Sequence, residues 1–308
     1  MYIRRGFLLT IPISQLEIWS KQGAIDTPKK LKEKIEKSLK SDSSKIQNKS
    51  QLNIFLQGSY RNSTNIYGNS DVDIVVQHNS TFSRNISNLT QSEIEMYKEI
   101  YKSATYTWED FKKEIIKTLS FTFGAENIEI ANKSIKINTG IYEADVIPCF
   151  EYRKYLSFGR ELNKRNYITG IKFYTEKDKA PIINYPKMHY ENGVIKNKNV
   201  YGNYKPTIRI FKNFKKELVK NNIIKKELAP SYFVENLLYN VPDEKYMNYD
   251  ISTRIYNILK WLYDNKNSLN KFKCQNEQIE LFGDSQEQWN ELEAKKFISS
   301  VINLWNEW

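Results

Sequence analysis

Two apolar runs joined by a polar loop constrain this chain more than any other feature of its sequence. Residues 51–57 and 71–77 have the composition of β-strands, and the loop between them is rich in Gly, Ser and Asn. The second run begins with Asp71 and Asp73. Because alternate side chains of a strand point to the same face, these two carboxylates project together, about 7 Å apart.

Paired carboxylates and a glycine turn are both suited to phosphate chemistry. Two like charges on one face repel each other, and hard divalent cations such as Mg²⁺ relieve that repulsion. Two such ions can stabilise the attacking and leaving oxygens of a phosphoryl transfer. Gly58 allows close approach of backbone to a ligand, and Ser59 adds a hydroxyl, which together predict a small phosphate cradle. For an isolated Asp-x-Asp, an exposed acidic start of a strand is the competing interpretation.

The hydrophobic pattern predicts an α+β chain. A helix is expected over residues 27–39, where Leu31, Ile35 and Leu39 recur at helical spacing, with Thr27 as its N-cap. Further helical patterns cover residues 91–119, 207–220, 231–240, 250–264 and 285–306, and further strands cover 127–130, 134–138 and 141–148. Residues 78–90 are predicted as a loop, and 151–203 show no clear pattern. We expect two domains, residues 1–204 and 205–308, with the site in the cleft between them.

Composition places bounds on the class of protein. The 308 residues include 47 Lys plus Arg against 36 Asp plus Glu, a net charge of +11, but the lysines are spread along the chain. Spread charge favours a compositional bias over a surface that tracks nucleic acid. Cys149 and Cys274 are the only cysteines, too few for a disulfide framework or a four-cysteine zinc site, and Cys149 is expected in the core. With no predicted signal peptide or membrane span, we expect a cytoplasmic protein.

The segment GSYRNSTNIYGNSDVDIVV resembles the Gly-Ser and Asp-x-Asp signature of the nucleotidyltransferase superfamily that includes DNA polymerase beta. Within it, the chain most resembles the bacterial cGAS/DncV-like nucleotidyltransferases of antiphage signalling, and the Asn184–Lys187 segment is similar to clade E. The resemblance implies a polymerase-beta-like core with a mixed sheet and a C-terminal helical domain. It also implies a third metal-binding carboxylate on a later strand, for which Asp145 is the candidate.

Two later motifs extend the resemblance. The run PTIRIFK, ending at Lys212, is similar to the motif that opens the family's second domain, and Ser231-Tyr232 matches a Ser-Tyr pair at a helix start. The resemblance implies that Lys212 and Ser231 bind the donor triphosphate, in addition to the phosphate cradle predicted at Gly58 and Ser59, and that Tyr232 stacks on a base. An ammonium suits phosphate and an aromatic ring suits any base. At helical spacing from Arg209, however, Lys212 could equally lie on a solvated face.

The implied function is synthesis of a cyclic dinucleotide messenger from nucleoside triphosphates such as ATP and GTP. Asp71, Asp73 and Asp145 would be catalytic and would hold two Mg²⁺ ions, or Mn²⁺, while pyrophosphate leaves. The family acts in CBASS antiphage defence, so a cyclic-nucleotide-activated effector is the expected partner. We expect a monomer that needs neither nucleic acid nor a membrane.

Two other functions compete. The basic charge slightly favours RNA-directed nucleotidyl transfer, to tRNA or other 3′ ends, but enzymes of that kind generally have an added RNA-binding module or are shorter, and this chain shows neither. A nucleotide sensor with a dead site is disfavoured because all three acids are present. Glu143 could be a fourth ligand, although a solvent or salt-bridge role on an edge strand is the simpler expectation. A loop role is expected for His189 rather than metal binding.

Overall fold

The computed structural model describes residues 11–24, 26–68, 72–141 and 143–308. These residues form two compact units. The sheet unit comprises residues 25–57 and 71–186, and the helical unit comprises 1–24, 58–70 and 187–308. Each is described by itself below.

The sheet unit is built on seven strands in the order β1-β2-β5-β4-β3, with β6 paired to β5 and β7 to β6. Their bounds are β1 Leu52–Leu56, β2 Val72–Asn85, β3 Ile128–Ile130, β4 Ile135–Asn138, β5 Glu143–Ser157, β6 Asn166–Tyr174 and β7 Pro181–Asn184. The β2–β5 pair is parallel and the other pairs are antiparallel. The expected mixed sheet is therefore confirmed.

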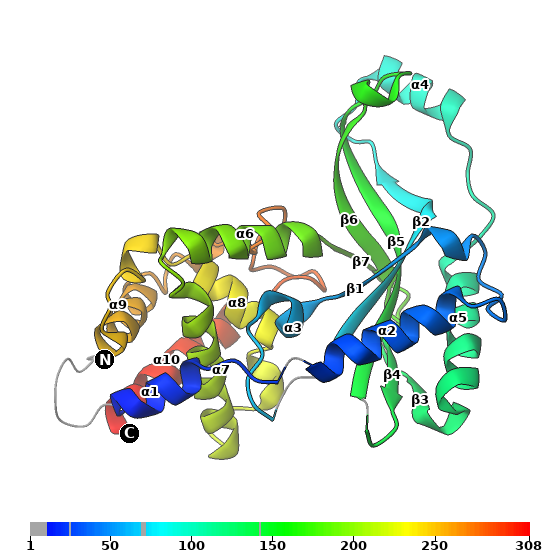
Figure 1. Ribbon diagram of the computed structural model, residues 1–308. Coiled ribbons are helices and arrows are strands. Elements are labelled where there is room, and N and C mark those ends of the chain that lie inside the picture. The colour runs from blue at the N-terminus through cyan, green and yellow to red at the C-terminus, as the bar shows by residue number, and fades with distance from the viewer. Residues whose placement is uncertain (1–10, 25, 69–71, 142) are drawn as a thin grey trace. The chain divides into compact units, whose positions relative to one another are not determined.

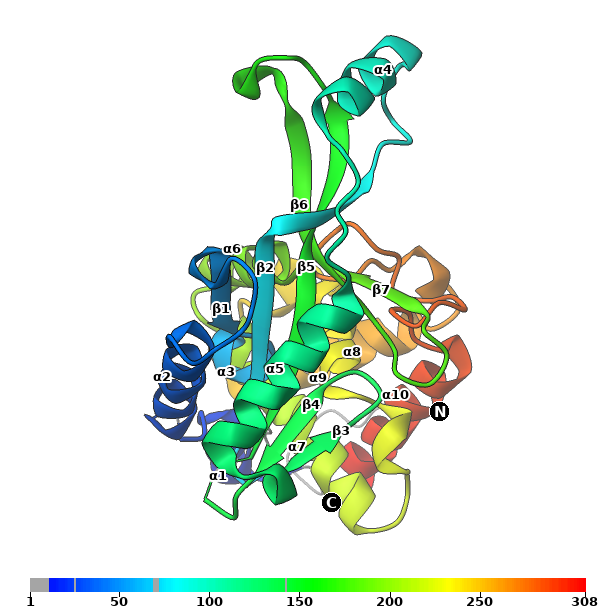
Figure 2. The ribbon, with the colours of Figure 1, turned by 90° about the vertical axis from the view of Figure 1, so that its right-hand side faces the viewer.

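Two helices, α2 (Asp26–Lys40) and α5 (Trp108–Phe123), cover one face of this sheet, as Figure 2 shows. The predicted apolar stripe of α2 is confirmed, since Leu31, Ile35 and Leu39 are fully buried. On α5, Phe111 stacks on Phe150 of β5, with ring centroids 5.8 Å apart. The even-numbered residues of β5 around Phe150 therefore face α5, and the odd-numbered residues point to the opposite face.

Two predictions in this unit are wrong. Residues 78–85 are not a loop but the outer half of β2, which pairs with β5 through residues such as Ser83 and Tyr152. Residues 91–119, predicted as helical, are interrupted at 101–107, which separate α4 (Gln91–Ile100) from α5. Thr90 and Thr107 each cap one of these helices, and the backbone N–H of each threonine donates in return to the carboxylate of an acidic residue three positions later. These two capping boxes were the sequence signal for separate helices.

The far ends of β5 and β6 extend away from most of the sheet, and α4 lies beside them, as Figure 1 shows. A separate apolar cluster holds this region together, formed by Leu89, Tyr97, Tyr155 and Phe158. The polar outer half of β2 is thus part of an arm with its own small core. Because these residues lie in the arm and not over the main core, residues 78–85 do not show the alternation of apolar and polar residues that is typical of a half-buried strand.

The helical unit contains α1 Ile13–Ser20, α3 Gly58–Asn62, α6 Pro186–Asn199 (whose first residue lies in the sheet unit), α7 Tyr204–Lys220, α8 Ser231–Tyr239, α9 Ile251–Asp264 and α10 Glu291–Glu307. The four helices predicted beyond residue 204 are confirmed, although α10 begins after the predicted residue 285. Trp289, Phe297 and Trp305 lie in the apolar core of the helical unit. None of the helices in the described residues combines the length and apolarity needed to cross a membrane.

The compact units divide the chain differently from the predicted domains 1–204 and 205–308. Residues 187–204 and two earlier segments group with the helices. One cause is the packing of α1 on α7, where Trp19 meets Phe214 edge to face at 5.5 Å between ring centroids. Arg209 of α7 also donates to the carbonyl oxygens of Ser20 and Ser63. Such contacts between distant segments have no signature in hydrophobic periodicity.

Candidate functional site

Asp73 and Asp145 are neighbours across the parallel strands β2 and β5, where they are Cα partners in the strand register. Adjacent strands lie about 4.8 Å apart, and directly opposed residues share a face. Both side chains are half-buried and lie on the face opposite α5. The sheet therefore brings together two of the three predicted carboxylates. The third, Asp71, lies outside the described residues.

Asp145 is held by a residue that the sequence did not indicate. The Ser134 hydroxyl donates a 2.6 Å hydrogen bond to Oδ1 of Asp145. Lys136 of β4 is the Cα partner of Asp145 on the other side and is exposed. Ser134 precedes a short strand, and nothing in its local pattern distinguishes it from any other strand-end serine.

An open groove of about 530 Å³ runs beside Asp145. It is lined by Glu129, Lys136, Asn138 and Glu143 among others. The Glu143 side chain is exposed on the same face as Asp145, two residues earlier on the strand. The face thus presents carboxylate oxygens, the ligands that hard divalent cations prefer, next to space open to a ligand. Within the described ranges, no three His, Cys, Asp or Glu side chains form a metal-binding group.

The remaining predicted site residues belong to the helical unit. Gly58 has a φ of 63°, a conformation that favours glycine, and Ser59 follows it in the short helix α3. The predicted loop of residues 58–70 therefore begins as a helical turn. Ser231 is the first residue of α8 and is exposed, and the half-buried Tyr232 follows it.

Lys212 of α7 is buried, with 4% of its surface exposed, so it does not lie on a solvated face. Its ammonium is 2.6 Å from Oε1 of Glu235. It also donates to the carbonyl and hydroxyl oxygens of Thr64, at 3.2 and 3.1 Å. An ammonium has three donors, so these three protein oxygens match its capacity.

Glu235 is the centre of this buried polar group. Besides Lys212, its carboxylate accepts from the Thr64 hydroxyl, from Nδ2 of Asn62 at 2.9 Å and from Nε2 of His189 at 3.3 Å. We call Glu235 and these four residues the Glu235 cluster. Burial alone would raise the pKa of Glu235, but the charge of Lys212 and the bonds from His189 and Lys212 hold it well below its usual range. The carboxylate is therefore ionised at neutral pH.

The prediction that His189 lies in a loop is wrong. It lies on α6 and is buried. Its ring stacks on Tyr232 with centroids 5.3 Å apart and an angle of 22° between planes. The hydroxyl of Tyr232 accepts a 3.4 Å hydrogen bond from Asn276. The predicted base-stacking ring is thus supported on one face by an imidazole that is itself bonded to Glu235.

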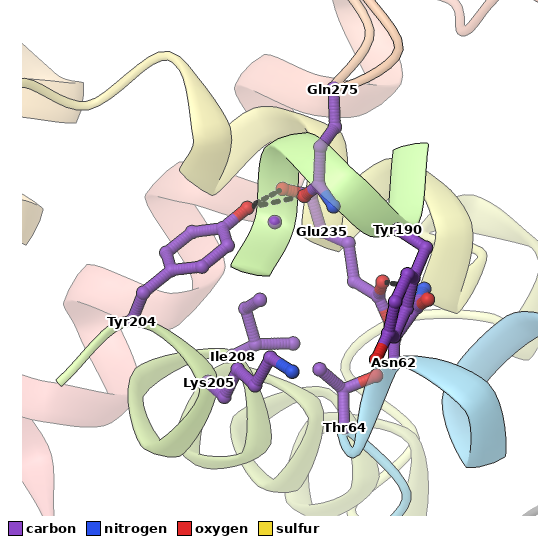
Figure 3. Close-up of a pocket in the computed structure, with 9 residues that line it drawn as sticks. Asn62, Thr64, Tyr190, Tyr204, Lys205, Ile208, Glu235 and Gln275 are labelled. Carbon is purple, nitrogen blue, oxygen red and sulfur yellow. Dashed lines mark hydrogen bonds between the residues drawn. The ribbon is translucent and has the colours of Figure 1, made fainter. Parts of the chain in front are cut away.

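A small cavity lies against Glu235, lined by Asn62, Thr64, Tyr190 and Lys205 among others (Figure 3). Its volume is about 10 Å³, close to the room that one water molecule needs. Across the cavity, the Tyr204 hydroxyl donates to Gln275 at 2.6 Å. A nucleotide phosphate is much larger than this space.

Comparisons with known proteins cover nearly the whole chain. Residues 32–138 match the nucleotidyltransferase domain family, and residues 191–306 match the cGAS/DncV-like nucleotidyltransferase C-terminal helical domain. The cyclic nucleotide synthase CdnE01 of Staphylococcus haemolyticus is 57% identical over 97% of this chain and all of its own length. The structure of the Rhodothermus marinus CdnE c-UMP-AMP synthase with Apcpp and Upnpp is 42% identical, with a TM-score of 0.84 and 97% of each chain covered. The Elizabethkingia meningoseptica CdnE cyclic dinucleotide synthase with GTP and Apcpp is 28% identical over 95% of this chain and 98% of its own, with a TM-score of 0.76.

Proposed function

This chain belongs to the cGAS/DncV-like nucleotidyltransferases, and we propose that it joins two nucleoside triphosphates into a cyclic dinucleotide with release of pyrophosphate. One observation carries the proposal: Asp73 and Asp145 stand side by side on an open sheet face, in a chain 57% identical to a cyclic nucleotide synthase over nearly its full length. Two half-buried carboxylates in register repel each other unless a cation lies between or beside them.

We propose that Asp73 and Asp145, together with Asp71, hold two Mg²⁺ ions. The residues fit such a group, because they offer hard oxygen ligands on adjacent strands and open space beside them. When bound, the ions supply the charge that activates the attacking ribose hydroxyl and stabilises the leaving pyrophosphate. The bond from Ser134 orients Asp145 and leaves its second carboxylate oxygen for a ligand.

The donor triphosphate is proposed to bind Gly58, Ser59, Lys212 and Ser231, with its base on Tyr232. Ser231 is exposed at the start of α8, and the Gly58 conformation allows close backbone approach. A direct bond from Lys212 to phosphate would replace one of its three present partners. Without such a replacement, Lys212 contributes positive charge rather than a contact.

RNA-directed transfer is not favoured, because the relatives that match nearly the whole chain are named cyclic nucleotide synthases. We also propose that the product acts as a messenger for an effector protein in antiphage defence. The enzyme would do this as a cytoplasmic monomer. Co-expression with a cyclic-nucleotide-activated effector protein should restrict phage, and co-expression of the Asp145→Asn variant should not.

The direct test is to incubate the protein with Mg²⁺ and each pair of the four nucleoside triphosphates. UTP with ATP comes first, because the Rhodothermus marinus relative is named a cyclic UMP-AMP synthase. A phosphatase-resistant product with the mass of a cyclic dinucleotide is expected, and it should be absent with Asp145→Asn. Incorporation that requires added tRNA or another RNA end would contradict the proposal.

A further inference from the structure

Glu235 has no direct route to a nucleotide. Its exposed fraction is 3%, and the cavity against it has a volume of about 10 Å³, enough for water but not for a phosphate group. All four partners of its carboxylate are protein donors. Any effect of Glu235 on the reaction must therefore pass through the residues it binds.

Glu235 and the residues it binds come from every segment that carries a proposed donor-binding residue. Asn62 ends α3, the helix that begins at Gly58 and Ser59, and the carbonyl of Ser59 accepts from the backbone N–H of Thr64 at 2.9 Å. Lys212 lies on α7. Glu235 itself is on α8, one turn after Ser231, so the two side chains share a face of that helix. One buried carboxylate thus joins these three segments.

His189 links Glu235 to Tyr232, the residue on which the base is proposed to stack. It donates to Glu235 through Nε2, and its ring stacks on Tyr232 at 5.3 Å. Nδ1 of this ring is buried and has no hydrogen-bond partner among the described residues, so the bond to Glu235 and the stacking on Tyr232 fix the orientation of the ring. A ring held in this way gives Tyr232 a fixed support.

We infer that Glu235 is a positioning residue for the donor nucleotide. By binding Asn62, Thr64, Lys212 and His189, it sets Ser59, Ser231 and Tyr232 in one arrangement before the nucleotide arrives. Preorganisation of this kind strengthens ground-state binding, so its loss raises KM more than it lowers kcat. The inference rests on the donor-binding part of the proposed function.

Glu235→Gln tests the inference because it keeps the shape and removes the charge. We expect KM for the nucleoside triphosphates to rise about tenfold, the size expected for weakened bonds to a charged group, with kcat within about threefold of wild type. Asp243→Asn is the matched control. It removes the carboxylate that pairs with another buried lysine of the same unit, Lys196, at 2.7 Å, and should lower Tm but leave KM unchanged.

A second pair of variants guards against misfolding of Glu235→Gln. Thr64→Val removes a hydroxyl that bonds both Glu235 and Lys212, whereas Thr64→Ser keeps it. KM should rise several-fold in the first and stay near the wild-type value in the second. Equal KM values for these two variants, an unchanged KM in folded Glu235→Gln, or an equal rise in Asp243→Asn would overturn the inference.

Calorimetric binding of non-hydrolysable ATP and UTP analogues with Mg²⁺ separates this inference from the proposed function. Suppose that wild-type protein makes no cyclic product but binds an analogue, and that Glu235→Gln weakens this binding while Asp243→Asn does not. The proposed reaction is then wrong and the positioning role stands. Wild-type protein that binds neither analogue would overturn the positioning role as well.

Discussion

At the scale of residues, the proposed chemistry depends on charges placed close together. Asp73 and Asp145 are Cα partners on neighbouring strands, and their mutual repulsion is a cost that a cation reverses. Lys212 and Glu235 are the opposite case, a buried pair of unlike charges with hydrogen bonds to both members. Removing one member of such a pair leaves an uncompensated buried charge and costs about 3–5 kcal/mol.

Asp145→Asn and Asp73→Asn should each reduce product formation by about 10³-fold or more while the circular dichroism spectrum stays unchanged. Each loses negative charge where the metal ions are proposed to bind. Glu143→Gln is the control, since Glu143 is an exposed carboxylate on the same face. Initial rates with Mg²⁺ measure the effect. A loss in Glu143→Gln as large as in Asp145→Asn would make Glu143 a ligand too, and full activity in Asp145→Asn would reject the third acid.

Tyr232→Ala should weaken nucleotide binding by about 1–3 kcal/mol, because it removes a ring on which a base can stack. Tyr232→Phe keeps the ring and its contact with His189 but loses the bond from Asn276, so it should stay near wild type. Calorimetric titration with a non-hydrolysable analogue measures both. Similar affinities in the two variants would argue against stacking.

At the scale of elements, α7 buries more positive charge than an ordinary surface helix. Arg209 and Lys212 are buried on it, and Lys215 is half-buried. Burial lowers the pKa of Lys215 to about 8, and the nearby charges of Lys226 and Lys212 add to this. In the unfolded chain the pKa of this group is close to its ordinary value of 10.5.

The lowered pKa of Lys215 makes the free energy of unfolding depend on pH. Between pH 8 and about 10 the unfolded chain binds more protons at Lys215 than the folded protein, so the contribution of this residue to stability improves as pH rises. Below pH 8 both states are protonated and the burial penalty is fully present. Lys215→Met should therefore raise Tm at pH 7, and this gain should shrink by pH 9.5. Thermal unfolding at both values tests this, with the exposed Lys220→Met as control. A gain independent of pH would show that the charge of Lys215 is not the cause.

At the scale of the whole molecule, the Cys and His side chains, all of which lie in the described residues, do not come together as a zinc site of the kind that could support nucleic-acid binding. The four Cys and His residues are separated in sequence and buried: Cys149, Cys274, His78 and His189. His78 bonds the carbonyl of Gln47, and His189 bonds Glu235. These residues belong to the interiors of the two units rather than to an inserted metal-binding module.

The enzyme should therefore be active with nucleoside triphosphates and Mg²⁺ alone. Nuclease-treated protein, assayed with and without duplex DNA, RNA or tRNA, should give equal rates, and chelation by EDTA should stop the reaction in every case. An activity that appears only with nucleic acid and falls steeply as salt rises would contradict this, and would assign the net charge of +11 a direct role.

Local patterns predicted much of this protein from its sequence. The stripe of α2, the strands β1 and β4, and the helices of the C-terminal half follow from periodicity, because each buries one face and repeats apolar residues at its own spacing. The strand β3 was also predicted, although its Glu129 and Ile130 are exposed. The resemblance of the Gly-Ser and Asp-x-Asp segment added the polymerase-beta-like core and the family to the α+β class that the pattern predicted. Asp145 could be proposed only by that resemblance, since an acid on a strand is otherwise unremarkable in composition.

The tertiary structure determined which residues from distant parts of the sequence lie side by side. The register of β2 against β5 places Asp73 beside Asp145, although 71 residues separate them, and the outer half of β2 is a strand because β5 pairs with it. The Glu235 cluster joins Asn62 to a residue 173 positions away, and a buried Glu has no sequence signal that distinguishes it from an exposed one. Periodicity reports which face of an element is buried, but partners across elements depend on how the chain packs. For that reason the sequence alone indicated the reaction, and only the folded protein showed which residues contact one another around the proposed site.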